Sequence, residues 1–324
     1  MQAAYINQTG AFSNIKVGEF PRPTIKANEV LVAVQAVAVN HVDTFVRSGG
    51  FKTALPLPAV IGRDAVGTVV AVGAQVTQFN HGQLVWTNSM GYAGRPGVTS
   101  TLAAIPAERL FPVPTGVDPR QLIGAVHSAA TAAILLQSVL QLKAGETLLV
   151  EGAAGHVGTK LVQVATALGA TVLATANPHD FARLAALGSY KSYDYHGDFA
   201  KLIAQEQATG IDAIVDTSGR VSLKTNLALL GVGGRIGLIT APKNNQFTFE
   251  VRQMYTRQQQ IQGFVISHAT LAQLQMAGKR VNQLMEQGKL LDDQLVVYPF
   301  SQAAQAHHLV ETNQVKAKII LIPD

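Results

Sequence analysis

A short glycine-rich segment between an apolar strand-like run and an apolar helix-like run has the composition that phosphate binding requires. Gly155 and Gly158 match the second and third glycines of the G-x-G-x-x-G pattern, and Ala153 occupies the first place. Such a turn lets the backbone approach a pyrophosphate, whose oxygens then face the N–H groups at the start of the helix. We predict a dinucleotide-binding turn; the alternative is an ordinary strand–helix turn that binds nothing. The predicted turn consists of Gly152, Ala153, Ala154, Gly155, His156, Val157 and Gly158.

The tip of the next expected strand indicates which dinucleotide is bound. NAD sites usually place Asp or Glu there, about 20 residues after the turn, to hold the ribose hydroxyls. Here the run Thr171–Thr175 is followed by Ala176 and Asn177, and the first carboxylate is Asp180. The missing carboxylate removes repulsion against a 2′-phosphate. The sequence therefore favours NADPH over NADH as cofactor, with Asn177 among the polar groups near the phosphate.

The elements around this turn predict a parallel sheet covered on both faces. A helix is expected over Asp118–Leu142, and strands then alternate with helices as far as Phe264. The first 115 residues are instead β-rich, with strand-like runs over Glu29–Asn40 and Val66–Gly73. A helix pair within Thr270–Gln287, a strand, a helix and a last strand close the chain. The alternating region thus forms an insertion, and the tail returns to the first domain.

Composition excludes several classes of protein. Of the 324 residues, 14% are charged and 48% are hydrophobic, so the chain has ample apolar material to form a core. The absence of cysteine excludes disulfides and cysteine-ligated metal centres and fits a cytoplasmic chain. The net charge of +5 is scattered, which argues against a nucleic-acid partner. No signal peptide is evident, and polar residues interrupt the uncharged stretch between Arg120 and Lys143, so we expect a buried helix and no membrane partner.

Several segments, in order and at family spacing, carry a family resemblance. They are Val37–Phe51, Leu57–Gly73, the helix around Thr131, Gly152–Gly158, Ala213–Gly219, Gly233–Ile239 and the terminal KAKIILIP. The chain resembles the zinc-independent quinone oxidoreductases, the zeta-crystallin group of the medium-chain dehydrogenase/reductase superfamily. The resemblance implies an α/β fold class with two domains. These are a GroES-like β-barrel catalytic domain (residues 1–120 and 268–324) and a Rossmann dinucleotide-binding domain with a doubly wound parallel sheet (121–267).

The resemblance also identifies the positions that bind catalytic zinc in the metal-dependent branch of the superfamily. These positions hold Asn40, Arg63 and His127. Asn and Arg are not plausible Zn²⁺ ligands, and one His cannot hold the ion alone. Without a metal, nothing polarises an alcohol for oxidation. We therefore expect no zinc and an acceptor that is already electrophilic, namely a quinone or an α,β-unsaturated carbonyl.

The resemblance further implies roles for individual residues. Phe45 and Phe51 stand where related reductases often carry Tyr beside the nicotinamide, and His156 replaces a usual Gly of the turn. Asn40 is a candidate for hydrogen bonding to the acceptor or to the nicotinamide ribose; the alternative is a helix N-cap. His127 is a candidate proton donor, although a buried histidine bonded to a backbone carbonyl is the favoured interpretation. The further expected cofactor contacts are Thr131, Tyr195 (alternatively a plain strand-end aromatic), Ser218 and Phe264.

Two functions from different classes follow. The first is an NADPH-dependent reductase that transfers hydride to a small-molecule quinone or enone. The second is a non-catalytic NADPH-binding protein, either a redox sensor or a structural protein, because the family contains a lens crystallin. The resemblance also implies a homodimer, with the strand-like run QIQGFVI as a possible pairing edge.

Overall fold

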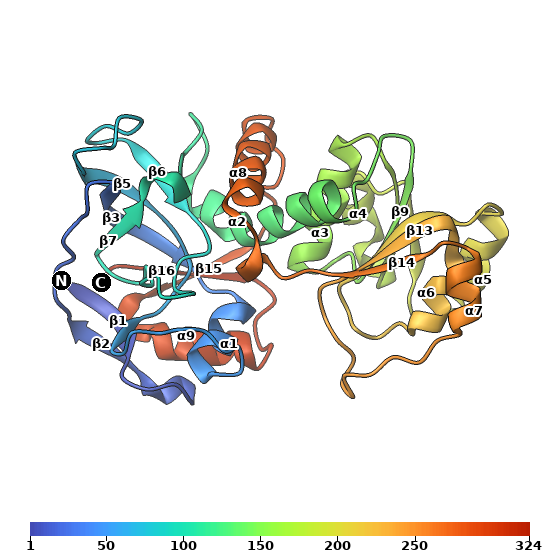
Figure 1. Cartoon of the computed structure of the whole chain (residues 1–324), viewed down its shortest axis with the longest axis horizontal. Coiled ribbons are helices and arrows are strands. Elements are labelled where there is room, and N and C mark those ends of the chain that lie inside the picture. Colours follow the sequence, from blue (N-terminus) through green and yellow to red (C-terminus); the bar gives the residue numbers. More distant parts are fainter. The chain divides into compact units, whose positions relative to one another are not determined.

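The computed structural model describes residues 1–324, which divide into two compact units. The terminal unit combines Met1–His127 with Leu274–Asp324, and the middle unit is Ser128–Gln273. Figure 1 shows the strands and helices of each unit. The boundary falls inside helix α2 (Pro119–Ile134), after His127. The predicted functional division, with boundaries at 120/121 and 267/268, stays a prediction.

The middle unit is built on a six-stranded sheet in which every neighbouring pair is parallel, in the order β11-β10-β9-β12-β13-β14. The order reverses direction between β9 and β12, which makes their carboxyl ends the switch point where open α/β sheets bind ligands. The strands are β9 (Thr147–Glu151), β10 (Thr171–Ala176), β11 (Lys191–Asp194), β12 (Ile211–Asp216), β13 (Leu230–Leu238) and β14 (Gln260–Gly263).

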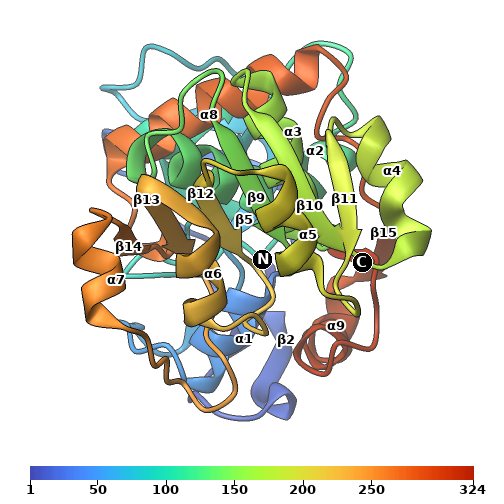
Figure 2. The same cartoon turned by 90° about the vertical axis from the view of Figure 1, so that its right-hand side faces the viewer.

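Helices cover both faces of this sheet. The connections from β9 to β10 and from β10 to β11 move toward one edge of the sheet. Those from β11 back to β12, which contains α5, and from β12 on to β13 and β14 move toward the other edge. Right-handed crossovers therefore place their helices on opposite faces, as Figures 1 and 2 show for α3 and α4 against α5 and α6. The helices are α3 (His156–Ala167), α4 (Phe181–Ala186), α5 (Phe199–Glu206), α6 (Leu223–Leu229) and α7 (Val251–Thr256). The predicted Rossmann-type, doubly wound parallel sheet is confirmed.

The terminal unit is mostly antiparallel β structure, with a seven-stranded sheet (β15-β16-β3-β5-β6-β8, with β7 also pairing β3) and a three-stranded sheet (β2-β1-β4). Its strands are β1 (Gln2–Ile6), β2 (Ile15–Glu19), β3 (Glu29–Ala38), β4 (Ala59–Val60), β5 (Asp64–Val72), β6 (Leu84–Thr87), β7 (Leu102–Pro106), β8 (Leu110–Pro112), β15 (Leu295–Pro299) and β16 (Lys318–Ile322). Its helices are α1 (His41–Ser48), α8 (Leu271–Glu286) and α9 (Ala303–Glu311).

Strand β3 pairs with strands from both the first and the last part of the chain. Its valine-rich sequence suits a strand that is buried on both faces. On one edge β3 pairs with β5, and at its carboxyl end Ala38 and Val37 pair with Ile320 and Leu321 of β16. The terminal unit is therefore completed only by the last strand of the chain.

Two helical regions differ from the expectation or refine it. The region expected to hold a helix pair is the single helix α8, because no residue between Leu271 and Glu286 breaks the hydrogen-bond ladder. The long apolar helix continues α2 through a π-helical turn, Leu135–Val139. Its span Pro119–Val139 is apolar enough to cross a bilayer, but 78% of its most apolar window is buried within the molecule, as in a core helix.

Gly278 of α8 packs closely against an aromatic ring of the terminal unit. A Cβ at this position would overlap the ring of Phe111, which stacks on the buried Trp86 with 4.5 Å between ring centroids. The Trp86 indole N–H also donates to Asn282 of α8, at 2.9 Å. We expect Gly278→Ala to lower the free energy of unfolding by about 1–3 kcal/mol, because overpacking outweighs the better helix propensity of Ala.

Urea denaturation measures this change. Gly18→Ala is the matched control, since a Cβ there meets nothing within 4 Å. An unchanged or raised midpoint for Gly278→Ala would contradict the packing argument.

Candidate functional site

Hydrogen bonds from the ends of two neighbouring strands, β10 and β12, hold the turn between β9 and α3. Gly152 has a φ of +71°, a conformation that favours glycine. Its N–H donates to the Thr175 hydroxyl at 3.2 Å, and its carbonyl accepts from the Thr217 hydroxyl at 3.1 Å. The Ala153 N–H donates to the Thr175 carbonyl at 3.0 Å. The path of the turn is thus set by β10 and β12 as well as by its own glycines.

The other two glycines of the turn have different reasons to lack a side chain. A Cβ at Gly158 would lie 2.7 Å from the Cα of Ala153, so glycine is needed for α3 to pack against the turn. A Cβ at Gly155 would meet only the Gly152 carbonyl, at an ordinary 3.5 Å, and the φ of −75° suits any residue. The protein itself therefore does not require glycine at position 155, whereas a ligand that touches the backbone there would.

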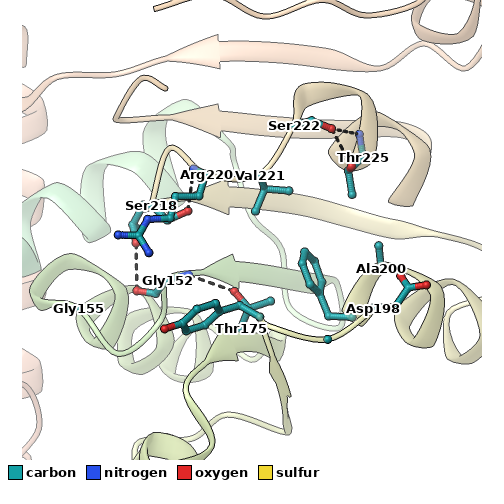
Figure 3. Close-up of a pocket in the computed structure, with 14 residues that line it drawn as sticks. Gly152, Gly155, Thr175, Asp198, Ala200, Ser218, Arg220, Val221, Ser222 and Thr225 are labelled. Atoms are coloured by element: carbon teal, nitrogen blue, oxygen red, sulfur yellow. Dashed lines mark hydrogen bonds between the residues drawn. The ribbon is translucent and has the colours of Figure 1, made fainter. Parts of the chain in front are cut away.

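A pocket of about 610 Å³ opens beside this turn at the carboxyl ends of the strands. In Figure 3, Gly152 and Gly155 lie on one side with Ser218 and Arg220 near them, and Asp198 and Ala200 lie on the opposite side. Phe199 and Val221 contribute apolar side chains to the lining. The lining residues are Gly152, Gly155, Thr175, Tyr195, Gly197, Asp198, Phe199, Ala200, Thr217, Ser218, Arg220, Val221, Ser222 and Thr225.

Four of the predicted cofactor contacts line this pocket, namely Gly152, Gly155, Tyr195 and Ser218. Within the same turn, Ala153 and Gly158 are buried, whereas Ala154, His156 and Val157 are half-buried. Three other predicted contacts lie outside the pocket lining. Asn177 caps a short 3₁₀ turn by accepting the His179 N–H at 3.3 Å, Thr131 is buried in α2, and Phe264 follows β14.

The N-terminus of α3, the positive end of the helix dipole, has no acidic side chain near it that would offset its partial charge. No side chain caps α3, and its first turn contains no acidic residue. The free N–H groups and the helix dipole therefore favour an anion at this point. Together with the open backbone at Gly155, this geometry suits the pyrophosphate of a dinucleotide.

Two carboxyl groups lie side by side where β9 and β12 end, a feature that the sequence analysis missed. Glu151 and Asp216 are register partners and are both buried. Asp216 accepts the N–H groups of Ser218 and Gly219 at 2.7 and 3.1 Å and so shapes the loop after β12. Glu151 accepts only the Asn226 amide, at 2.9 Å, and its Oε1 has no partner. Burial, and then repulsion from Asp216, raises the pKa of Glu151 to about 8.

In the terminal unit, side chains from distant segments converge on one carboxylate, that of Asp64. It is fully buried, and its Oδ1 accepts the Ser89 N–H at 3.0 Å. Its Oδ2 accepts the Asn40 amide at 2.8 Å and lies 3.1 Å from the Nδ1 of His127. Burial alone favours the neutral acid, but His127, Arg63 and the Ser89 N–H outweigh it and hold the pKa of Asp64 below its ordinary value. One partner of His127 is therefore the Asp64 carboxylate, whereas the sequence analysis favoured a backbone carbonyl.

Asn40 is fully engaged within this group. It precedes α1 at the N-cap position, and its Nδ2 donates to both Asp64 and Asp43, the latter at 3.2 Å. Its Oδ1 accepts from the Nζ of Lys318, a buried residue of β16. Burial, and then repulsion from Asp64, raises the pKa of Asp43 to about 6. These contacts give Asn40 a positioning role.

Aromatic and cationic side chains lie next to the Asp64 group. The buried Arg63 guanidinium lies over the Tyr92 ring, 5.4 Å from its centroid. Phe51 stacks on Tyr92 with 5.3 Å between centroids and 19° between planes. Phe45, in contrast, lies on α1 with 56% of its surface exposed. The sequence analysis named Phe51 and Arg63 but did not predict that Tyr92 joins them.

The side chains at the zinc-ligand positions do not fit a zinc ion. The amide of Asn40 is occupied by Asp43, Asp64 and Lys318, and Arg63 is itself a cation. His127 alone offers a nitrogen ligand, whereas a zinc site needs three or four Cys, His or carboxylate ligands. No group of three or more such side chains has metal-site geometry anywhere in the structure.

The raised pKa of the buried Glu151 predicts that the stability of the protein depends on pH. Because its pKa is raised in the folded state, the folded protein keeps a proton that the unfolded chain releases above about pH 5. The free energy of unfolding should therefore fall as pH rises from about 5 to 8. Glu151→Gln removes the ionisable group and should stabilise the protein by about 2–4 kcal/mol at pH 9, with little effect at pH 4.

Denaturation at the two pH values, with the exposed Glu286→Gln as control, measures the difference. An equal effect of Glu151→Gln at both pH values would show that the carboxyl group is not protonated in the folded state.

Comparisons with known proteins match both units. The family model of the alcohol dehydrogenase GroES-like domain matches residues 26–115, and that of the zinc-binding dehydrogenases matches residues 157–281. The GroES-like assignment is thus confirmed alongside the Rossmann sheet. The residues at the expected ligand positions nevertheless depart from the zinc-binding pattern, as described above.

Individual relatives are similar over nearly the whole chain. A quinone oxidoreductase from Sus scrofa is 31% identical over 312 residues, covering 93% of this chain and 91% of the relative. A mycobacterial protein solved in complex with NADPH is 27% identical with a TM-score of 0.82, and each chain is fully covered. A solved NAD-dependent alcohol dehydrogenase is 26% identical with a TM-score of 0.86, again over the whole of both chains. The chain therefore belongs to the quinone oxidoreductases of the medium-chain dehydrogenase/reductase superfamily and is an oxidoreductase with a small-molecule substrate.

Proposed function

We propose that the chain is an NADPH-dependent reductase of quinones or α,β-unsaturated carbonyls that works without a metal. The observation that carries the proposal is Gly155, which faces a pocket of about 610 Å³ although the protein itself could accommodate a side chain there. A backbone left open beside an uncapped helix N-terminus suits a pyrophosphate. When bound, the reduced nicotinamide supplies the hydride.

The rest of the pocket suits the adenosine half of the cofactor. Phe199 and Val221 offer apolar surface for a flat base, and Tyr195 is a further stacking group. Ser218 is held by Asp216 through both its N–H and its hydroxyl, each at 2.7 Å, so this wall of the pocket is rigid. These side chains would bind and orient the nucleotide without taking part in the chemistry.

The preference for NADPH rests on the tip of β10. The strand ends at Ala176, and the next residue, Asn177, is neutral, so no carboxylate repels a 2′-phosphate. The first acidic group, Asp180, comes three residues later and lies 3.2 Å from the Nε2 of His179. The mycobacterial relative supports this preference because it was solved with NADPH, whereas the NAD-dependent relative is the reason for testing both nucleotides.

The acceptor class follows from the terminal unit and from the relatives. The Phe51 ring, half-buried and stacked on Tyr92 next to the Arg63 guanidinium, is a flat aromatic group that suits a planar, electron-poor molecule. The zinc-ligand positions supply no Lewis acid, so the acceptor must itself be electrophilic. Quinones meet this condition, and the pig relative is named for them. We extend the class to enones, which stabilise an added hydride by conjugation in the same way.

The proposal extends to assembly and location. Strand β14 is one of the two edge strands of the middle sheet, so it can pair with the same strand of a second copy to form a homodimer. A cytoplasmic location agrees with the absence of cysteine. Light scattering of the purified chain would test the dimer.

Gly155→Val tests the nucleotide site. We expect the variant to fold, because a side chain at this position meets no close protein atom, and to lose at least about 100-fold in affinity for NADPH, because the side chain blocks the backbone from the pyrophosphate. Fluorescence titration measures the affinity, and circular dichroism checks the fold. Gly18→Val, in β2 with an open Cβ position, is the matched control and should bind normally. Wild-type affinity in Gly155→Val would mean that the nucleotide binds elsewhere.

The function itself is tested by cofactor and acceptor together. We expect NADPH to bind at least about tenfold more tightly than NADH, a difference of about 1.4 kcal/mol, because no carboxylate meets the 2′-phosphate. NADPH oxidation should then depend on added quinone or enone in a panel of both. Tight NADPH binding without oxidation by any acceptor would favour the non-catalytic sensor or structural role. Equal dissociation constants would contradict the cofactor preference.

A further inference from the structure

Two buried carboxyl groups belong to residues that immediately precede the lining of the proposed nucleotide pocket. Glu151 and Asp216 are register partners at the ends of β9 and β12, and the two residues are 0% and 2% exposed. Gly152, which follows Glu151, lines the pocket, and so do Thr217 and Ser218, which follow Asp216. Because register partners in neighbouring parallel strands direct their side chains to the same face of a sheet, the two carboxyl groups lie next to each other.

The two carboxyl groups have different numbers of hydrogen-bond donors. Oδ1 of Asp216 accepts the N–H and the hydroxyl of Ser218, both at 2.7 Å, and the N–H of Gly219 at 3.1 Å. Three donors are the surroundings that stabilise a carboxylate. Glu151 accepts only the amide of Asn226, at 2.9 Å, while its Oε1 and the Oδ1 of Asn226, both buried, have no partner. The donors therefore favour a charged Asp216 and a neutral Glu151.

The groups that act on the charge of Glu151 include no cation. Burial, and then repulsion from Asp216, raises the pKa of Glu151 to about 8, and only the Asn226 amide acts in the opposite direction. The neighbouring strand β10 contributes the neutral Thr175 as register partner. The basic residues of the adjoining segments are not among the groups that shift this pKa. They are His156 and Lys160 of α3, Lys224 of α6 and Arg220 of the loop after β12.

A nucleotide in the pocket would add negative charge close to this pair. Gly152 belongs to the turn proposed to bind the pyrophosphate, and Ser218, which Asp216 holds, lines the same pocket. A negatively charged ligand there makes ionisation of Glu151 less favourable. By thermodynamic linkage, an ionised Glu151 must weaken the binding of that ligand by the same factor. Its charge would also repel Asp216, which holds the Ser218 side of the pocket in place.

We propose that the Glu151–Asp216 pair couples nucleotide binding to a proton: the pocket binds tightly while Glu151 is neutral and more weakly once that proton has left. The inference rests on the proposed function, because it concerns the same site. Neither carboxyl group lines the pocket, so both are positioning residues. Asp216 holds Ser218, and a neutral Glu151 lets the neighbouring charge stay buried. When Glu151 ionises, its proton goes to water and no other covalent bond changes.

The pH dependence of the NADPH dissociation constant tests this coupling. Fluorescence titration measures it between about pH 7 and 9.5, where the 2′-phosphate is already ionised because its second pKa is about 6. We expect the constant of the wild type to rise at least about fivefold over this range. Glu151→Gln keeps a neutral side chain of similar shape and should bind equally tightly at both limits. The control, Glu286→Gln at an exposed position, should keep the wild-type dependence.

NADH distinguishes the two phosphate positions of the cofactor. Its dissociation constant should rise by a similar factor, because the pyrophosphate proposed to bind next to Gly152 is common to both nucleotides. A rise confined to NADPH would overturn the proposal, since it would indicate a group near the 2′-phosphate. A constant that does not change with pH in the wild type would overturn it as well, and so would an equal rise in Glu151→Gln.

Calorimetry in two buffers of different ionisation enthalpy gives a second readout that needs no variant. At about pH 8.5, each NADPH that binds should bring about half a proton onto the protein, and at about pH 7 much less. Tight binding without this uptake would overturn the inference alone, even if the chain reduces quinones. Failure to bind either nucleotide at any pH would instead overturn the proposed function, and this inference with it.

Discussion

The arrangement of the terminal unit depends on one buried negative charge, that of Asp64, which needs hydrogen-bond donors in place of water. A buried carboxylate is several kcal/mol less favourable than a hydrated one unless donors replace its water. Here Asn40, Ser89 and His127 replace it, and they come from the start of α1, the loop after β6 and the helix α2. Because each donor must keep its place for the charge to remain tolerable, this one carboxylate fixes three segments that are far apart in the sequence.

In the middle unit, the position of the backbone at the turn after β9 depends on glycines, which have no side chain. At Gly158 the absence of a Cβ lets α3 approach the turn, and at Gly155 it leaves backbone exposed to the pocket. The position of the backbone that borders the pocket follows from the sheet and needs no rotamer to be selected. One unit therefore orients side chains through a buried charge, and the other orients backbone through close packing.

Local patterns were sufficient to predict most of the fold and part of the candidate site. The glycine turn, the valine-rich β3 and the strand–helix alternation are all encoded within about 30 residues, and so is the short helix after Asn40. The Asp64 partners are not, since Asn40 and Lys318 are 278 positions apart and His127 lies 63 positions from Asp64. Only the fold brings such groups together. A signal was nevertheless present at two positions, since Lys318 begins an apolar strand and Glu151 ends another.

The pairing of β16 with β3 makes the order of synthesis matter to this protein. Lys318, which orients the Asn40 amide, lies seven positions from the last residue, Asp324, counting both. The middle unit has all of its strands once residue 263 has been made, but the terminal unit lacks an internal strand and the Asp64 group lacks one positioning residue until the final segment emerges. A chain that lacks the segment from Lys318 onward can therefore keep every strand of the middle sheet while its Asn40 amide lacks the partner that orients it.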